Sequence, residues 1–170
     1  SSLLHVLAGL IDPESGSVRV GETDLSSLTR TAAALYRRRR CGVIFQSFNL
    51  LDMLSVAENV AFPLGLDGIS QRETTARVDD LLDEVGLRER RDDFPDQLSG
   101  GEQQRIAIAR ALAIRPDVVL ADEPTGNLDS ESGIRIWMLL RDLSRKHGTT
   151  TLMVTHDPDA TAYVNRVVEL

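Results

Sequence analysis

The sequence predicts an α/β fold in which a mostly parallel sheet is covered on both faces by helices. Short apolar runs of strand length alternate along the chain with longer segments of helical periodicity. Helix-capping signals and turn residues separate these segments, and no stretch approaches the ~18 apolar residues of a membrane span. The 170 residues fit one domain, and an apolar content of 42% supports a packed core.

The first third of the chain predicts two helices and two strands. Leucines at helical spacing open the sequence with no capping residue before them, so we expect the chain to begin inside a helix. The expected elements are a helix containing Leu3, Leu4, Leu7 and Leu10, a turn at 12–16, a strand at 17–20, a turn at 21–24, a helix at 29–40 and a buried strand at 41–45.

The rest of the chain continues the alternation. Three serines, each followed three residues later by a glutamate, are typical of capping boxes: Ser55 with Glu58, Ser70 with Glu73, and Ser99 with Glu102. We expect Pro63 to end the first of these helices, Gly86 to end the second, and the third to stop before Pro116. The last expected elements are a buried strand at 118–121, a helix capped by Asp129 or Ser130 and closed by Gly148, a strand at 150–155, a short helix at 158–163 and a strand at 165–170.

The charge balance excludes several classes of protein. Nineteen basic residues against 26 acidic ones give a net charge of −7, so no nucleic-acid partner is expected, because generic binding of that kind needs a positive surface. The lone cysteine, Cys41, cannot form an intrachain disulfide and is expected to be an inert buried side chain. The only lysine, Lys146, suits the end of a helix, and we interpret the run from Arg37 to Arg40 in the same way rather than as a contact to anionic lipid or to nucleotide. On the long helix we expect four apolar side chains to face the core: Trp137, Ile134, Met138 and Leu140.

An acidic pair, Asp122 and Glu123, follows the expected strand at 118–121. A sheet that hydrolyses nucleotides needs one acid to hold Mg²⁺, which Asp122 can do, and a second to polarise an attacking water, which Glu123 can do. The alternative is a solvated acidic turn, since acid pairs are common.

The segment 98–105, Leu-Ser-Gly-Gly-Glu-Gln-Gln-Arg, places two glycines at a helix N-terminus. Exposed N–H groups and the helix dipole favour an anion there, and Ser99 adds a hydroxyl donor. The capping box alone would indicate only an ordinary capped helix.

This octapeptide resembles the signature sequence of ATP-binding-cassette (ABC) ATPases, and four more segments resemble landmarks of that family in the family's order. They are the glutamine loop at 43–46, the Walker B strand at 118–124, the D-loop at 127–130 and the switch-histidine loop at 155–157. The segments FQSFNLL and ADEPTGNLDS are most similar to those of the family branch that serves lipoprotein release, macrolide export and cell division. The resemblance implies a single partial nucleotide-binding domain over 1–170, with a helical signature subdomain at 47–110 and a P-loop NTPase-like (RecA-like) core in the remainder.

The resemblance also implies tasks for individual residues. Glu123 would act on the attacking water, His156 would contact the γ-phosphate, and the neutral amide of Gln46 would reach Mg²⁺ and the water. The Mg²⁺ ligands would be Ser1, Gln46 and Asp122, and the contacts to ATP would come from Ser1, Ser2, Ser99, Gly100, Gly101, Gln103 and Asp129. Without this context Gln46 would be a solvated loop residue, His156 a structural or surface residue, and Asp129 a plain helix cap.

Partners follow from the same resemblance. Two subunits would pack head to tail, so that the signature of one faces the ATP of the other, and nucleotide-driven closure and opening of this dimer would energise a transmembrane permease subunit. The apolar stretch from Gln46 to Pro63 is a candidate groove for a cytoplasmic helix of that permease. We therefore expect a peripheral protein on the cytoplasmic face of the cell membrane. The alternatives are an ATPase that regulates a membrane partner in cell division and a soluble ABC ATPase of DNA repair or translation.

A phosphate-binding loop of the form G-x-x-x-x-G-K-[ST] does not occur in the sequence. The start Ser1-Ser2-Leu3-Leu4 resembles the stretch directly after the lysine of such a loop, and Lys146 cannot replace that lysine from the end of a long helix. We therefore expect the first strands and the phosphate loop to precede residue 1, and the 170 residues alone to bind ATP poorly and to hydrolyse it negligibly.

Overall fold

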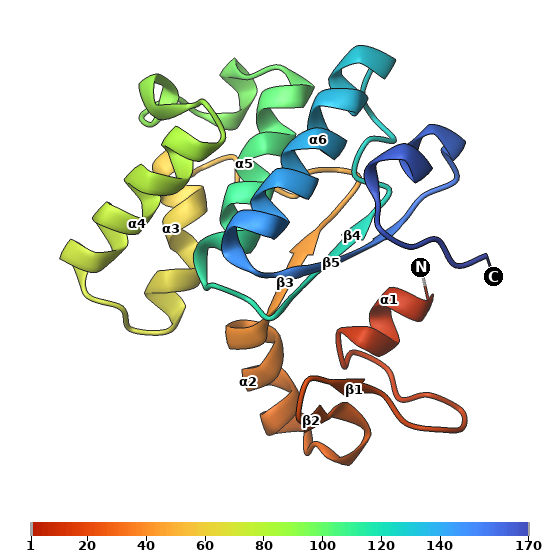
Figure 1. Ribbon diagram of the computed structural model, residues 1–170. Helices are drawn as coiled ribbons and strands as arrows, with labels where there is room; N and C mark the ends of the chain where they lie inside the picture. Colours follow the sequence, from red (N-terminus) through yellow and green to blue (C-terminus); the bar gives the residue numbers. More distant parts are fainter. Residues whose placement is uncertain (1, 170) are drawn as a thin grey trace.

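A three-stranded parallel sheet, in the order β3-β4-β5, forms the centre of the computed structural model, which describes residues 2–169 (Figure 1). Its strands are β3 (Cys41–Ile44), β4 (Val118–Asp122) and β5 (Thr150–Val154). Cys41 lies beside Val118, and Val118 beside Thr150, so the carboxyl ends of all three strands meet at one edge. The predicted parallel sheet is confirmed, and the loops at this edge lie where α/β folds bind ligands.

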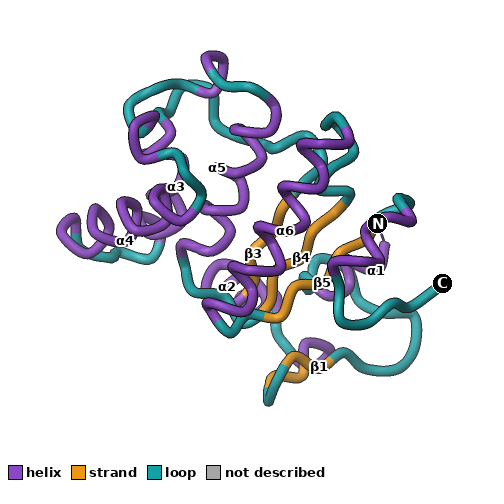
Figure 2. The backbone as a smooth tube through the Cα atoms, turned by 45° about the horizontal axis from the view of Figure 1, so that its top comes forward, coloured by secondary structure: helices purple, strands orange, loops and turns teal. Residues whose placement is uncertain are grey.

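Helices cover both faces of the sheet (Figures 1 and 2). Alternate residues of β4 divide between two apolar clusters, Val119 and Ala121 in the larger one and Val118 and Leu120 in the smaller one. The larger cluster is completed by α3 (Val56–Leu66), α4 (Gln71–Glu84), α5 (Gly100–Ala113) and α6 (Ser130–His147). The smaller cluster is completed by α1 (Ser2–Leu7), α2 (Arg30–Arg40) and residues around the β1 (Arg19–Val20) and β2 (Thr23–Asp24) hairpin.

Serine caps begin α3, α4 and α5, as predicted. Ser55 and Ser99 form complete capping boxes, each serine exchanging hydrogen bonds with the glutamate three residues on. At Ser70 the box is half formed, because Glu73 accepts from the serine hydroxyl at 2.7 Å and not from the serine backbone. Caps of this kind stabilise a helix by about 0.5–2 kcal/mol each.

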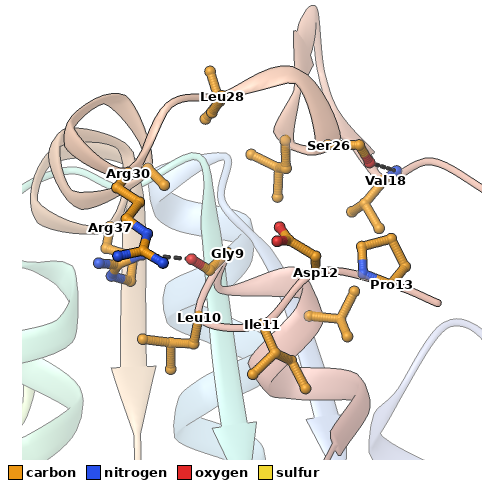
Figure 3. A pocket seen from close by; sticks show the side chains of 13 residues that line it. Gly9, Leu10, Ile11, Asp12, Pro13, Val18, Ser26, Leu28, Arg30 and Arg37 are labelled. Atoms are coloured by element: carbon orange, nitrogen blue, oxygen red, sulfur yellow. Dashed lines mark hydrogen bonds between the residues drawn. The ribbon is translucent and has the colours of Figure 1, made fainter.

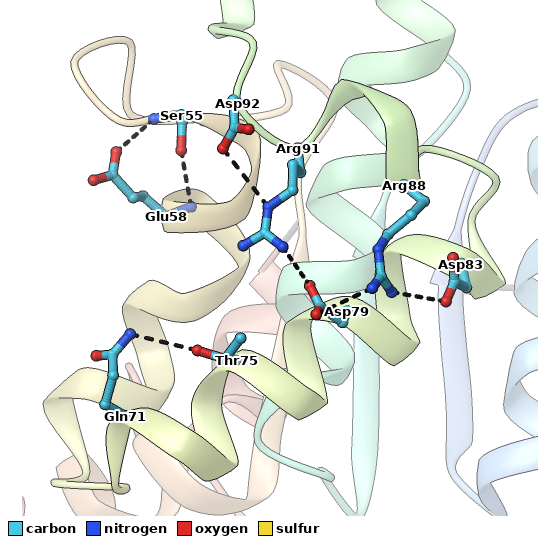
Figure 4. Close-up of polar contacts among 9 residues, drawn as sticks. All are labelled: Ser55, Glu58, Gln71, Thr75, Asp79, Asp83, Arg88, Arg91 and Asp92. Atoms are coloured by element: carbon cyan, nitrogen blue, oxygen red, sulfur yellow. Dashed lines mark hydrogen bonds and ion pairs between the residues drawn. The ribbon is translucent and has the colours of Figure 1, made fainter.

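Polar contacts fasten α4 to the elements around it. Asp79 accepts hydrogen bonds from Arg88 at 3.2 Å and from Arg91 at 2.9 Å, beyond the end of the helix (Figure 4). Glu84, in the last turn of α4, pairs with Lys146 at 3.0 Å. The only lysine of the chain therefore lies at the C-terminal end of α6, as predicted, and ties that end to α4.

The four arginines that end α2 all have partners. Arg37 donates to the carbonyl of Gly9 at 2.6 Å, beside a cavity of about 350 Å³ between α1, α2 and the β1–β2 hairpin (Figure 3). The other three pair with carboxylates, Arg38 and Arg39 with Asp67, and Arg40 with Asp117. These contacts support a structural role for the run at a helix end.

Two expectations about helices are wrong. Pro63 does not end its helix, since α3 continues to Leu66; proline removes one backbone donor, but Val60 before it and Leu64 directly after it are both buried in the core and keep the helix packed through this position. On α6, Trp137 and Leu140 are buried as expected, but Ile134 and Met138 lie on the outer side, 39% and 43% exposed.

Two expectations about chain segments also change. Residues 21–24 contain β2, which pairs antiparallel with β1, so a turn alone does not describe them. Residues 165–169 form no strand: none of the described strands pairs with them, and Val167 and Val168 are exposed. Within residues 2–169 no helix has both the length and the apolar composition needed to cross a bilayer.

Candidate functional site

The loops that follow β3, β4 and β5 bring the three predicted catalytic residues to the carboxyl edge of the sheet. Gln46 lies two residues after β3, Glu123 directly after β4, and His156 two residues after β5. Hydrogen bonds join Glu123 to His156, and join Gln46 to Asn127 in the segment after β4. The parallel order of the strands therefore gathers side chains that are far apart in the sequence.

Glu123 adopts a left-handed backbone conformation, with φ +46°. A residue other than glycine pays about 1–3 kcal/mol for a sparsely populated conformation, so neighbouring groups must hold it. Its N–H donates to the carbonyl of Val154 at 2.9 Å, and its own carbonyl accepts the N–H of Gly126 at 3.0 Å. The turn fixes the direction in which the Glu123 side chain leaves the sheet.

The carboxylate of Glu123 binds His156 at two points. Its Oε1 lies 3.1 Å from the backbone nitrogen of His156, which donates to it, and 2.8 Å from the ring Nδ1. The hydrogen bond with Glu123, and then its negative charge, raise the pKa of His156 above the ordinary histidine value. The glutamate side chain is 21% exposed and the histidine side chain 83%, so the pair leaves the imidazole accessible at the edge of the sheet.

Gln46 and Asn127 hold each other across the edge between β3 and β4. The amide of Asn127 donates to the carbonyl of Gln46 at 3.0 Å, and the amide of Gln46 lies 3.4 Å from Oδ1 of Asn127. A Cβ at Gly126 would lie 2.7 Å from Nε2 of Gln46, so only glycine allows this approach. Sequence reasoning missed the roles of Gly126 and Asn127, because it had no signal for a contact between segments 81 residues apart.

Asp122 is the last residue of β4 and directly precedes Glu123. Its carboxylate and the amide oxygen of Gln46 are hard oxygen donors, the kind that Mg²⁺ prefers. Within residues 2–169 no group of three or more histidine, cysteine, aspartate or glutamate side chains could hold a metal ion by itself. These donors fit Mg²⁺ as it is usually bound with nucleotides, through one or two protein ligands together with phosphates and water. Ser1, the third predicted ligand, lies outside the described residues.

The N-terminus of α5 begins with Gly100 and Gly101, behind the N-cap Ser99. The first N–H groups of a helix have no partner within it, so this end can receive an anion. The hydroxyl of Ser99 donates to Glu102 at 2.7 Å and would have to leave that carboxylate to bind a phosphate. A Cβ at Gly100 would lie only 3.3 Å from Leu128, so packing against the segment after β4 also favours glycine at this position.

The other predicted nucleotide contacts have structural partners or lie apart. Gln103 donates to the carbonyls of Pro95 and Leu98, at 2.9 and 3.2 Å, and braces the turn before α5. Asp129, not Ser130, caps α6; the backbone N–H of Ser132 donates to its carboxylate and lowers the pKa of Asp129. Ser2 is exposed at the start of α1. The structure leaves the role of each of these residues toward ATP a prediction.

Gln104 is a site neighbour that sequence reasoning did not single out. Its side chain is fully buried, and its amide donates to the carbonyl of Pro124 at 2.6 Å. Pro124 follows Glu123, so α5 is fastened directly to the turn that carries the acidic pair. The one sequence signal for Gln104 is that it lies inside the signature octapeptide. That motif does not indicate that Gln104, rather than Gln103, contacts the turn after β4.

Comparison with known proteins agrees with this geometry. The family model described as "ABC transporter" matches residues 1–126. An uncharacterized ABC transporter ATP-binding protein of Mycobacterium tuberculosis is 46% identical over all 170 residues, which correspond to 68% of its own length. The ATP-binding protein of a lipoprotein-releasing system of Rhodospirillum rubrum is 44% identical over the whole chain and 75% of its own length. The solved structure of the ATP-binding cassette MJ0796, dimeric and bound to ADP and Pi, superposes with a TM-score of 0.81 at 37% identity, over 95% of this chain and 72% of the other. The chain therefore belongs to the ABC transporter family, as an ATP-binding cassette subunit.

Proposed function

We propose that this chain hydrolyses ATP as the motor subunit of an ABC transporter, with Glu123, His156 and Gln46 as its catalytic residues. The observation that supports this most directly is the 2.8 Å contact between Oε1 of Glu123 and Nδ1 of His156 at the carboxyl edge of the sheet. A carboxylate held in this way can accept a proton from water, and it needs no rearrangement of the backbone to do so.

Each residue has a distinct task in this proposal. Glu123 is the general base, and His156 holds its carboxylate and presents the imidazole toward the substrate phosphates. The amide of Gln46, fixed by Asn127, orients water without adding charge. Asp122 and Gln46 would hold Mg²⁺, which supplies positive charge to the phosphate oxygens when it is bound.

We propose further that two copies assemble head to tail. Ser99, Gly100 and Gly101 of one copy would then face the nucleotide bound by the other, with Gln103 nearby and Asp129 bridging the two copies. The glycine-rich N-terminus of α5 supports this arrangement, because the first N–H groups of a helix can receive an anion once the Ser99 hydroxyl leaves Glu102. The similar cassette MJ0796 was solved as a dimer. In this arrangement residues 47–110 form the helical signature subdomain and the remainder the core.

A permease is the second proposed partner. Large apolar side chains are exposed around α3, and they are Leu51, Met53, Phe62, Leu66 and Ile69. An apolar surface of this kind suits a helix of a membrane subunit laid against it. We therefore propose that the protein works on the cytoplasmic face of the membrane, bound to such a subunit.

Steady-state ATP hydrolysis by the complete gene product tests the catalytic assignment. Glu123→Gln should lower kcat by at least about 100-fold, because the base is lost while the shape is kept. The control is Glu131→Gln on the exposed side of α6, where Arg135 is the one ion-pair partner of Glu131 among residues 2–169, and its kcat should stay within about twofold of the unsubstituted protein. Hydrolysis that survives Glu123→Gln at the normal rate would refute the assignment.

A further inference from the structure

Arg110, in the last turn of α5, binds the loop that carries Gln46. Its guanidinium donates to the main-chain carbonyl of Phe48 at 2.9 Å and also to that of Asn49. Both acceptor residues are left-handed, with φ +61° and +50°. Two consecutive residues other than glycine in this conformation are unfavourable without outside support. The arginine supplies that support two and three residues after Gln46.

The charge of Arg110 has no carboxylate partner within residues 2–169, unlike the arginines that pair with Asp79. Burial lowers the pKa of Arg110, which reflects the cost of taking the guanidinium out of water. A neutral side chain of similar size would fill the same space without that cost. The hydrogen bonds to the two loop carbonyls therefore explain why a charged side chain is buried at this position.

The loop held by Arg110 touches the rest of the site at two more places. The ring of Phe48 approaches the start of α5, where a Cβ at Gly100 would lie 3.5 Å from its Cζ. Gln46 exchanges hydrogen bonds with Asn127. A shift of the 48–49 turn would therefore move the amide of Gln46 and the contact of Phe48 with the signature glycine together.

We infer that Arg110 is a positioning residue, which sets the place of the Gln46 amide by clamping the carbonyls of Phe48 and Asn49. The inference rests on the proposed function, because it assigns Arg110 a part in the same hydrolysis. Arg110 touches neither nucleotide nor metal in this account, and acts only through the loop.

Arg77, on the neighbouring helix α4, provides a matched control for Arg110. Its guanidinium also donates to two consecutive main-chain carbonyls, those of Leu112 and Ala113, at 2.8 and 3.3 Å. Burial lowers the pKa of Arg77 as well. Its carbonyls end α5 and lie apart from the glutamine loop, so Arg77→Met removes the same chemistry from a place without a proposed part in hydrolysis.

The experiment compares Arg110→Met, Arg110→Lys and Arg77→Met in the complete gene product, by hydrogen exchange without nucleotide and by ATP hydrolysis. In Arg110→Met the Phe48 and Asn49 amides should exchange at least about tenfold faster, and kcat should fall about 10- to 100-fold with KM little changed. Arg110→Lys should recover part of both losses, because an ammonium keeps the charge but lacks the planar, preorganised fork with which the guanidinium matches two carbonyls. Arg77→Met should leave the exchange of these two amides and kcat near normal, although both methionine variants melt earlier.

Equal kcat and equal loop exchange in the two methionine variants would overturn the inference and leave Arg110 a purely structural residue. Hydrogen exchange without nucleotide separates this outcome from failure of the proposed function. If Glu123→Gln leaves hydrolysis intact, the catalytic assignment fails, whereas faster loop exchange in Arg110→Met still reports the clamp itself.

Discussion

Gly126→Ala should move the amide of Gln46 without unfolding the protein. The added Cβ would lie 2.7 Å from Nε2 of Gln46, whereas ordinary van der Waals contact begins at 3.4 Å, so the amide must retreat by about 0.7 Å. The neighbouring atoms are the flexible end of a side chain, and the φ of Gly126 is not left-handed, so the backbone accepts alanine. The 3.4 Å contact with Asn127 Oδ1 is then lost or lengthened. A displacement of this size at a catalytic group costs up to about 100-fold in rate.

Two measurements on the complete gene product separate rate from stability. We expect kcat for ATP hydrolysis to fall about 10- to 100-fold, while the free energy of unfolding in urea changes by less than about 1 kcal/mol. Gly65→Ala is the control, because a Cβ at Gly65 in α3 meets nothing within 4 Å. That variant should keep its kcat and gain about 0.5–1 kcal/mol of stability. A normal kcat in Gly126→Ala would show that the place of the Gln46 amide does not limit hydrolysis.

Two further predictions concern the charge at the sheet edge and the packing beneath it. His156 should titrate above the ordinary value of about 6.5, and Glu123→Gln should lower that pKa, as followed by the imidazole proton signals in NMR; an unchanged titration would contradict the pairing. Because the pKa is raised, the ionic contact is fully present below the ordinary value and is lost as pH rises through the raised one. Gly42→Ala should destabilise the fold by about 1–3 kcal/mol in urea unfolding, since its Cβ would lie 2.5 Å from the carbonyl oxygen of Ala111, whereas Gly133→Ala meets nothing closer than 3.5 Å and should not destabilise it. Equal stabilities of the two glycine variants would refute the steric argument.

The local features of the fold could be predicted because local chemistry decides them. A serine with a glutamate three residues later caps α3 and α5 through contacts within one helical turn. An apolar run between two turns forms a strand such as β4. Pro63 shows the limit of this reasoning. The sequence contains the proline that disfavours the helix, but it does not contain the core into which Leu64 packs one residue later.

The sequence predicts which residues belong to the candidate site, but it does not predict which of them contact one another. Asp122 and Glu123 can be found from the strand they follow, and Gln46 and His156 from motifs of a known family. The left-handed φ of Glu123, the approach of Gly126 to Gln46 and the grip of Arg110 on Phe48 all depend on which strands are neighbours. That order is a property of the assembled sheet, since Arg110 and Phe48 are 62 residues apart and no local signal links them.

The pairing of β4 with β5 explains why a glutamate can occupy the strained position after β4. The carbonyl of Val154, at the end of β5, accepts the N–H of Glu123, and the same chain continues two residues further to place His156 against the carboxylate. One neighbouring strand therefore supports both the backbone and the side chain of the proposed base. A glutamate on a free turn would relax to an ordinary φ, and its carboxylate would turn toward water. Because His156 lies in the loop after β5, movement of that loop acts on the carboxylate of Glu123, so the histidine and the glutamate side chains are expected to respond together when a nucleotide binds at this edge.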